Sequence, residues 1–287
     1  MRCSVRGLDY LIRIWGPDSG PTVVLLHGIL DTSSTFQFLV DSLNGEWRVL
    51  APDWRGHGQT ERPANNGWFH DYLADLDVLL DTYLPNQTVN LVGHSLGGNL
   101  ASVYAGVRPS RVRRMISVDA FAMIESPAEN FPNRLYGWLE SGRSARRIKV
   151  YPSIETMAER LCGANHRLAW SKALYLANVS SQRLPDGNYT WLFDLARQRS
   201  VQTIRHLEEW FACWRCITAP SLWIGASEPL PRTARTDPQT IARVLQQIGP
   251  DRVVYVANTG HHIQHDAPRE LAGIIEDFLN RDCPGQH

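Results

Sequence analysis

The segment with the clearest chemical potential is G-H-S-L-G at residues 93–97, which places Ser95 between two glycines. An apolar run at residues 89–92 precedes it, and a helical pattern follows it. A strand that turns sharply into a helix strains the central residue and lifts its side chain out of the sheet. The glycines leave room for that turn, where any Cβ would collide with the neighbouring backbone. We therefore predict that Ser95 is a nucleophile at a helix N-terminus, where developing negative charge is favoured.

A serine hydroxyl needs a base within hydrogen-bond reach, and the base needs an acid that orients it. The loop after the last predicted strand offers three histidines, which are His261, His262 and His265. We favour His261 because a glycine precedes it and places it at a tight turn. The spacing of the three would also suit metal ligands, but no H-E-x-x-H pattern accompanies them, so no metal is expected. We expect His57 and His94 to form local hydrogen bonds rather than to act in catalysis.

The orienting acid has two candidates, because two acidic residues follow predicted strands. Asp119 comes directly after the strand at residues 114–118, and Glu228 follows the strand at residues 221–224. Either carboxylate could reach an imidazole from the carboxyl edge of the sheet. The residues alone leave the choice open, because an Asp at a strand end is often a turn-former or a helix cap.

An oxyanion formed by attack on a carbonyl needs two backbone N–H donors. We expect one from Leu96, the residue after the nucleophile. The other is expected from Ile29, in the loop H-G-I-L that follows the strand at residues 22–26. The plainer interpretation of that loop is a glycine turn that merely ends a strand.

The composition is that of an ordinary globular protein, with 43% hydrophobic and 20% charged residues among 287. The formal net charge of zero argues against nucleic-acid or anionic-membrane partners. No apolar run is long enough to span a bilayer, and no apolar signal core follows the basic N-terminal residues. The odd number of cysteines, five, fits a reducing compartment better than a disulfide framework. We expect a cytoplasmic monomer or homodimer.

Short apolar runs alternate with helical patterns along most of the chain, which predicts a mostly parallel sheet covered by helices on both faces. The expected strands are at residues 11–15 (an edge strand), 22–26, 47–51, 88–92, 114–118, 221–224 and 252–256. The expected helices are at residues 36–43, 72–84, 96–107, 238–248 and 268–279.

The stretch between residues 121 and 212 breaks this alternation. It lacks clear buried strands, is rich in aromatic residues, and has helix-like segments at residues 133–140, 154–161, 168–176 and 201–210. An insertion of this kind would lie over the carboxyl ends of the strands, where open α/β sheets place their sites. We therefore expect a core domain of residues 1–120 and 213–287 and a helical cap of residues 121–212 that shapes an apolar pocket. The alternative is a helical subdomain with no role in selectivity.

Taken together, these motifs resemble the α/β-hydrolase superfamily, in the branch that carries a helical cap, over nearly the whole chain. The matching segments are H-G at residues 27–28, P-D-W-R-G-H-G at 52–58, the serine elbow, G-H at 260–261 and D-A-P at 266–268. The resemblance implies Ser95 as nucleophile, His261 as base, and the N–H groups of Ile29 and Leu96 as oxyanion donors. In this family the serine precedes the histidine along the chain, as it does here.

The acid is where this chain departs from the family pattern, because G-A-S-E at residues 225–228 stands where Gly-x-x-Asp is usual. Some relatives instead carry the acid after the preceding strand, among them several haloalkane dehalogenases, zearalenone lactone hydrolases and cofactor-free quinolone dioxygenases. The resemblance therefore favours Asp119, with Glu228 as the alternative. Dehalogenases and epoxide hydrolases of this fold use an Asp nucleophile, and Ser95 argues against both.

We predict a serine hydrolase that cleaves carboxylic esters of small molecules through an acyl-enzyme, without a cofactor. A lactone hydrolase or a carbon–carbon bond hydrolase would use the same residues. A ligand-binding protein on this fold and a cofactor-free oxygenase stay open, because a fold does not fix a function.

Overall fold

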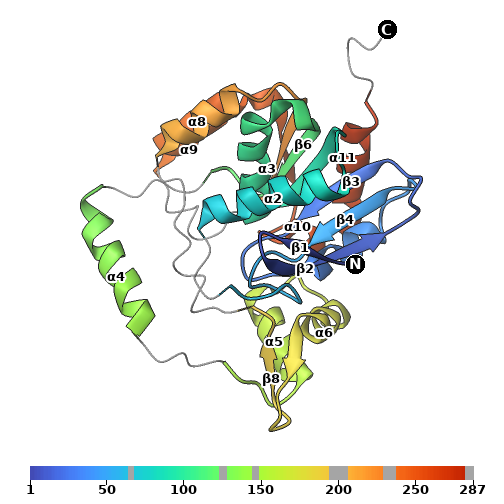
Figure 1. Ribbon diagram of the computed structural model, residues 1–287, viewed down its shortest axis with the longest axis vertical. Coiled ribbons are helices and arrows are strands. Elements are labelled where there is room, and N and C mark those ends of the chain that lie inside the picture. The colour runs from blue at the N-terminus through green and yellow to red at the C-terminus, as the bar shows by residue number, and fades with distance from the viewer. Residues whose placement is uncertain (64–67, 123–127, 144–148, 194–205, 229–236, 282–287) are drawn as a thin grey trace.

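The computed structural model describes residues 1–63, 68–122, 128–143, 149–193, 206–228 and 237–281. Within these residues the centre is an eight-stranded sheet in the order β1-β2-β4-β3-β5-β6-β9-β10 (Figure 1). Its strands are β1 (Arg2–Val5), β2 (Leu8–Trp15), β3 (Thr22–Leu26), β4 (Arg48–Pro52), β5 (Val89–His94), β6 (Val112–Val118), β9 (Ser221–Ala226) and β10 (Val253–Val256). β2 pairs antiparallel with β1 and β4, and all other neighbours are parallel. The predicted α/β class and mostly parallel sheet are confirmed.

The helices that surround the sheet follow the predicted alternation. They are α1 (Gln37–Val40, after the 3-10 turn η1 at Ser33–Phe36), α2 (Phe69–Tyr83), α3 (Leu96–Val107), α8 (Leu207–Arg215), α9 (Pro238–Ile248), α10 (Ile263–Asp266) and α11 (Pro268–Leu279). The predicted bounds of the helices at 96–107, 238–248 and 268–279 match the structure. No helix in the described part of the chain combines the length and apolar character of a bilayer-spanning segment.

Alternating side chains of the central strands build a hydrophobic core on each face of the sheet. Val24 and Leu26 pack in the core that α2, α3, α8 and α9 cover, whereas Val23 and Leu25 pack in the core under α1 and α11. Successive side chains of a strand point to opposite faces, so each apolar run supplies both cores. Burial on both faces holds the strands in place, and the predicted site residues follow the ends of these strands.

Between β6 and β9 the chain forms a separate group of helices. α5 (Ile154–Ala164), α6 (Trp170–Val179) and a hairpin of β7 (Ser181–Arg183) and β8 (Tyr189–Trp191) lie together beyond one end of the sheet (Figure 1). They share a small hydrophobic core that includes Met157, Leu176 and Trp191. α4 (Phe131–Arg143) stands apart from this group in the same view.

Polar contacts place this group at the carboxyl edge of the sheet. The Lys172 ammonium donates to the carbonyl of His265 at 2.7 Å, and the Asn165 amide donates to Asp266 at 2.7 Å. Both partners follow β10, so α5 and α6 contact the loop at that edge. The helical cap of residues 121–212 stays a prediction.

Two expectations about strands were wrong. The strand expected at the sheet edge, residues 11–15, lies inside it, because β1 pairs along its outer side. The β7–β8 hairpin lies in the stretch expected to be helical. Residues 201–205 of the helix predicted at 201–210 lie outside the described residues, and α8 begins at Leu207.

Candidate active site

Ser95 lies at the sharp turn between β5 and α3, and its backbone is strained. Its φ of 54° and ψ of −116° belong to a region that non-glycine residues rarely occupy. A Cβ added to Gly93 would lie 2.2 Å from the carbonyl oxygen of Gly97, and one added to Gly97 would lie 2.0 Å from that of Leu26. Both glycines are therefore required for the turn, as the sequence predicted.

Asp119 and His261 are joined directly. Asp119 follows β6, and its Oδ2 lies 2.6 Å from Nδ1 of His261, in the loop after β10. Its Oδ1 accepts a hydrogen bond from the N–H of Ala226 at 3.1 Å, so both carboxylate oxygens are held. The carboxylate therefore keeps the proton of His261 on Nδ1 and leaves the lone pair on Nε2, the tautomer that a general base needs.

Glu228, the alternative acid, makes a different contact. It forms an ion pair with Arg167 of the group around α5, and 61% of its side chain is exposed. The hydrogen bond to Arg167 lowers the pKa of Glu228. The structure thus brings Asp119, and not Glu228, to the imidazole of His261.

The loop after β3 reaches over the serine elbow. A Cβ added to Gly28 would lie 3.1 Å from Cβ of Ser95, so the backbone of this loop passes close to the serine. Neither the N–H of Ile29 nor that of Leu96 has a hydrogen-bond acceptor within the described residues. Leu96 is the first residue of α3, and the first N–H groups of a helix have no partner within it. That Ile29 and Leu96 bind an oxyanion stays a prediction.

The Ser95 hydroxyl and His261 lie on neighbouring loops without a hydrogen bond between them among the described residues. The ring of His261 packs against that of His94, the residue before the serine, with centroids 4.7 Å apart. In substrate-free enzymes the bond between nucleophile and base is often long and tightens when substrate binds.

His94 links the two loops through a local hydrogen bond, as expected. Its Nε2 donates to the carbonyl of His261 at 2.8 Å, which ties the base to the residue beside the nucleophile. Burial, followed by the charge on His261, lowers the pKa of His94 well below its usual value. His57 likewise donates from Nδ1 to the carbonyl of Arg55 at 2.9 Å.

Asp31 is a residue of this region that sequence reasoning missed. It lies between Leu30 and the turn η1, and its Oδ1 accepts from the N–H of Thr32 at 2.9 Å. Burial raises the pKa of Asp31 to about 7. Its only signal in the sequence is its place shortly after β3, which by itself predicts no role.

A family model described as alpha/beta hydrolase fold matches residues 21–268. The chain belongs to the α/β-hydrolase family. Among the relatives of this α/β-hydrolase is a serine hydrolase-like protein of Danio rerio, 26% identical over 285 residues, which span 96% of this chain and 86% of the relative.

A second relative of this α/β-hydrolase is the 2-(acetamidomethylene)succinate hydrolase of Mesorhizobium japonicum. It is 27% identical over 265 residues, which span 91% of this chain and 89% of the relative. Among solved structures, the thioesterase domain from the curacin biosynthetic pathway superimposes with a TM-score of 0.82 and 25% identity, over 96% of this chain and 98% of that one. The family and these relatives support a hydrolase activity.

Proposed function

We propose that this α/β-hydrolase is a serine esterase, with Ser95 as nucleophile, His261 as base and Asp119 as the orienting acid. The observation that carries the proposal is the 2.6 Å contact between Asp119 Oδ2 and His261 Nδ1, at the sheet edge where the strained elbow presents Ser95. A neutral imidazole held in this tautomer is the group that a serine hydroxyl requires for activation.

The proposed reaction has two halves. Ser95 Oγ attacks the ester carbonyl while His261 Nε2 takes the hydroxyl proton, and the N–H groups of Ile29 and Leu96 bind the oxyanion. The imidazolium then protonates the departing alcohol, which leaves an acyl group on Ser95. His261 next takes a proton from water, the resulting attack forms a second oxyanion, and the acid departs with the serine reprotonated. Asp119 keeps its negative charge throughout and stabilises the imidazolium.

The substrate class is proposed as small to medium carboxylic esters. The relatives named as hydrolases support bond cleavage by water, and the elbow serine supports an acyl-enzyme route. Lactones are cyclic esters and would follow the same steps, so they belong to the same test.

The test is hydrolysis of p-nitrophenyl acetate and butyrate by the purified chain, with Ser95→Ala and Ser102→Ala compared at equal concentration. Ser102 is a buried serine of α3 whose hydroxyl donates to the carbonyl of Asn99 at 2.9 Å, so it is a matched control. We expect turnover by the wild type and by Ser102→Ala, and a loss of at least about 10³-fold in Ser95→Ala. A panel of lactones is assayed in the same way, and equal rates in wild type and Ser95→Ala on esters and lactones alike would refute the proposal.

A further inference from the structure

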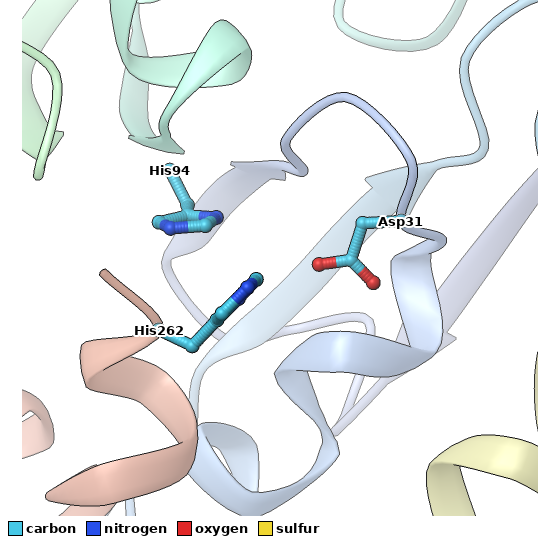
Figure 2. A group of neighbouring side chains, drawn as sticks. All are labelled: Asp31, His94 and His262. Carbon is cyan, nitrogen blue, oxygen red and sulfur yellow. The ribbon is translucent and has the colours of Figure 1, made fainter. Parts of the chain in front are cut away.

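Beside the proposed catalytic residues lies a second cluster, formed by Asp31, His94 and His262 (Figure 2). Its members come from three different places: the loop after β3, the end of β5 and the loop after β10. Each side chain offers one nitrogen or oxygen atom, and these three atoms lie within 4.8 Å of one another. Figure 2 shows the carboxylate and the two rings turned toward a shared space.

The protein leaves part of this cluster without hydrogen bonds. Within the described residues, Oδ2 of Asp31 and Nδ1 of His262 are buried and have no hydrogen bond of normal geometry, although the Thr35 hydroxyl lies near the Asp31 carboxylate. Nδ1 of His94 accepts a long hydrogen bond, 3.3 Å, from the Gln264 amide. A buried polar atom without a partner costs about 1–3 kcal/mol. Two such atoms in one cluster could be satisfied by a single bound group.

The chemical types of the three side chains indicate which group would bind them. Two imidazoles and one carboxylate are ligands typical of Zn²⁺ and similar divalent transition ions, whereas Mg²⁺ and Ca²⁺ prefer oxygen ligands.

The surroundings of the cluster also resemble those of a metal site. A histidine ligand usually donates its other ring N–H to a carbonyl or carboxylate, which fixes the tautomer and the ring orientation. His94 does this with Nε2 toward the carbonyl of His261, at 2.8 Å, so its lone pair is on Nδ1. Asp31 is likewise held at Oδ1 by the N–H of Thr32.

The present spacing is wider than a loaded site requires. Tetrahedral ligands bonded about 2.0–2.2 Å from zinc lie about 3.4 Å from one another. The three side chains would therefore approach one another by about 1 Å on binding. Because two of them are on loops, side-chain rotation and small loop shifts are sufficient. Three protein ligands leave a fourth position for water.

We propose that Asp31, His94 and His262 bind a divalent transition ion such as Zn²⁺, and that the bound ion inhibits hydrolysis. Inhibition follows from position, because His94 directly precedes Ser95 and His262 directly follows His261. Movement of His94 and His262 onto an ion would shift Ser95 and His261 from their present relative position, and a misplacement of about 1 Å costs about 10²-fold in rate. The inhibitory half of this proposal rests on the proposed esterase function, whereas the binding half does not.

Binding is tested first, without reference to activity. The full chain is stripped with EDTA and titrated with ZnCl₂ by equilibrium dialysis in a Cys216→Ser background, which removes an exposed thiol that could bind zinc. We expect one Zn²⁺ per chain, retained in the Ser95→Ala variant, and no competition from excess Mg²⁺. Asp31→Asn and His262→Gln should each weaken binding by at least about 10-fold, whereas the exposed His70→Gln should not.

Circular dichroism and urea unfolding check that each variant is folded. If either Asp31→Asn or His262→Gln does not fold, the other one is used for the test. Absence of zinc binding, or binding that neither variant weakens, would overturn the proposal and leave water as the occupant of the cluster.

Inhibition is tested second. The measurements are the Zn²⁺ concentration that halves the rate of ester hydrolysis and the recovery of that rate after EDTA is added. If the wild type hydrolyses no ester, the proposed function fails while the dialysis result still decides whether the site exists.

Discussion

Asp119 Oδ2 and His261 Nδ1 lie 2.6 Å apart although 142 positions of the chain separate the two residues. The parallel order β5-β6-β9-β10 brings their loops to one edge of the sheet, beside the elbow that carries Ser95. The carboxylate is held at its other oxygen by Ala226, so it presents a fixed acceptor to the imidazole.

The first prediction concerns this contact. Asp119→Asn keeps the shape of the side chain but removes the charge and allows the wrong tautomer of His261. We expect kcat for ester hydrolysis to fall by about 10⁴-fold, as the same exchange does in a serine protease triad. Glu228→Gln, which removes only the pairing with Arg167, should change kcat by less than about 3-fold. Steady-state kinetics of both variants check this, and a larger loss in Glu228→Gln would reverse the assignment of the acid.

The second prediction concerns the loop that lies over the nucleophile. In Gly28→Ala the new methyl group would meet Cβ of Ser95 and Nδ1 of His94, each at 3.1 Å. The loop must shift, which displaces the Ile29 donor, and we expect kcat to fall about 10- to 100-fold. Gly163→Ala is the matched control, because a Cβ there meets nothing within 4 Å. Unchanged kcat in Gly28→Ala would show that this loop takes no part in the reaction.

The third prediction concerns the buried ion pair of Arg55 and Asp75. The Asp75 side chain is fully buried, and Arg55 donates to its two oxygens at 2.6 Å each. Asp75→Asn removes the carboxylate that Arg55 binds through two hydrogen bonds and leaves it only that of Asp71, at 3.7 Å. We therefore expect the free energy of unfolding to fall by about 3–5 kcal/mol. Urea denaturation measures it. Asp81→Asn, which breaks an exposed pair with Arg111, should cost less than about 1 kcal/mol, and similar losses in the two variants would contradict this account.

The fourth prediction concerns stability in acid. His27 is buried, and it accepts a hydrogen bond from the N–H of Trp54 at Nε2 and donates from Nδ1 to the carbonyl of Gly28. Burial lowers the pKa of His27 from 6.5 to about 3. Between these two pH values the unfolded chain binds a proton at this residue and the folded chain does not. Stability conferred by neutral His27 is therefore lost as the pH falls below about 6.5, by about 1.4 kcal/mol per pH unit.

His27→Gln removes that proton uptake, so the variant should lose stability less steeply between pH 6 and pH 4 than the wild type. Urea unfolding at pH 7.0, 6.0, 5.0 and 4.5 compares the slopes, which are independent of any constant loss that the substitution causes. His70→Gln, at an exposed histidine, should keep the wild-type slope. Parallel curves for His27→Gln and wild type would refute the prediction.

Much of the fold could be predicted because its signals are local and repeated. The predicted bounds of β3 and α3 match the observed ones. An apolar run bounded by polar residues marks β3, and a glycine turn and a proline bound α3, so each signal lies within a few positions of the element it predicts. β1 was missed because four residues, only one of them buried, carry no strand pattern. Pairing with β2 makes that segment a strand, and pairing partners are not visible in a short stretch of sequence.

The site residues likewise divide into those that a contiguous motif predicts and those whose role depends on the fold. The elbow and its two glycines are contiguous, so the geometry of Ser95 followed from the sequence. The choice between Asp119 and Glu228 depended on which loop reaches His261, and the residue types alone could not decide it. The cluster of Asp31, His94 and His262 has no sequence signature, because its members lie at the end of one strand and in two loops whose approach is set by the sheet.

The most direct test of the central claim is the site and rate of labelling by a fluorophosphonate, which reacts with activated serine hydroxyls. Intact-mass and peptide mass spectrometry of the full chain should show one adduct, on Ser95, and none in Ser95→Ala. His261→Asn should slow labelling by at least about 10³-fold, because the hydroxyl loses its base. An adduct on another residue, or equal labelling rates with and without the His261 imidazole, would contradict the account.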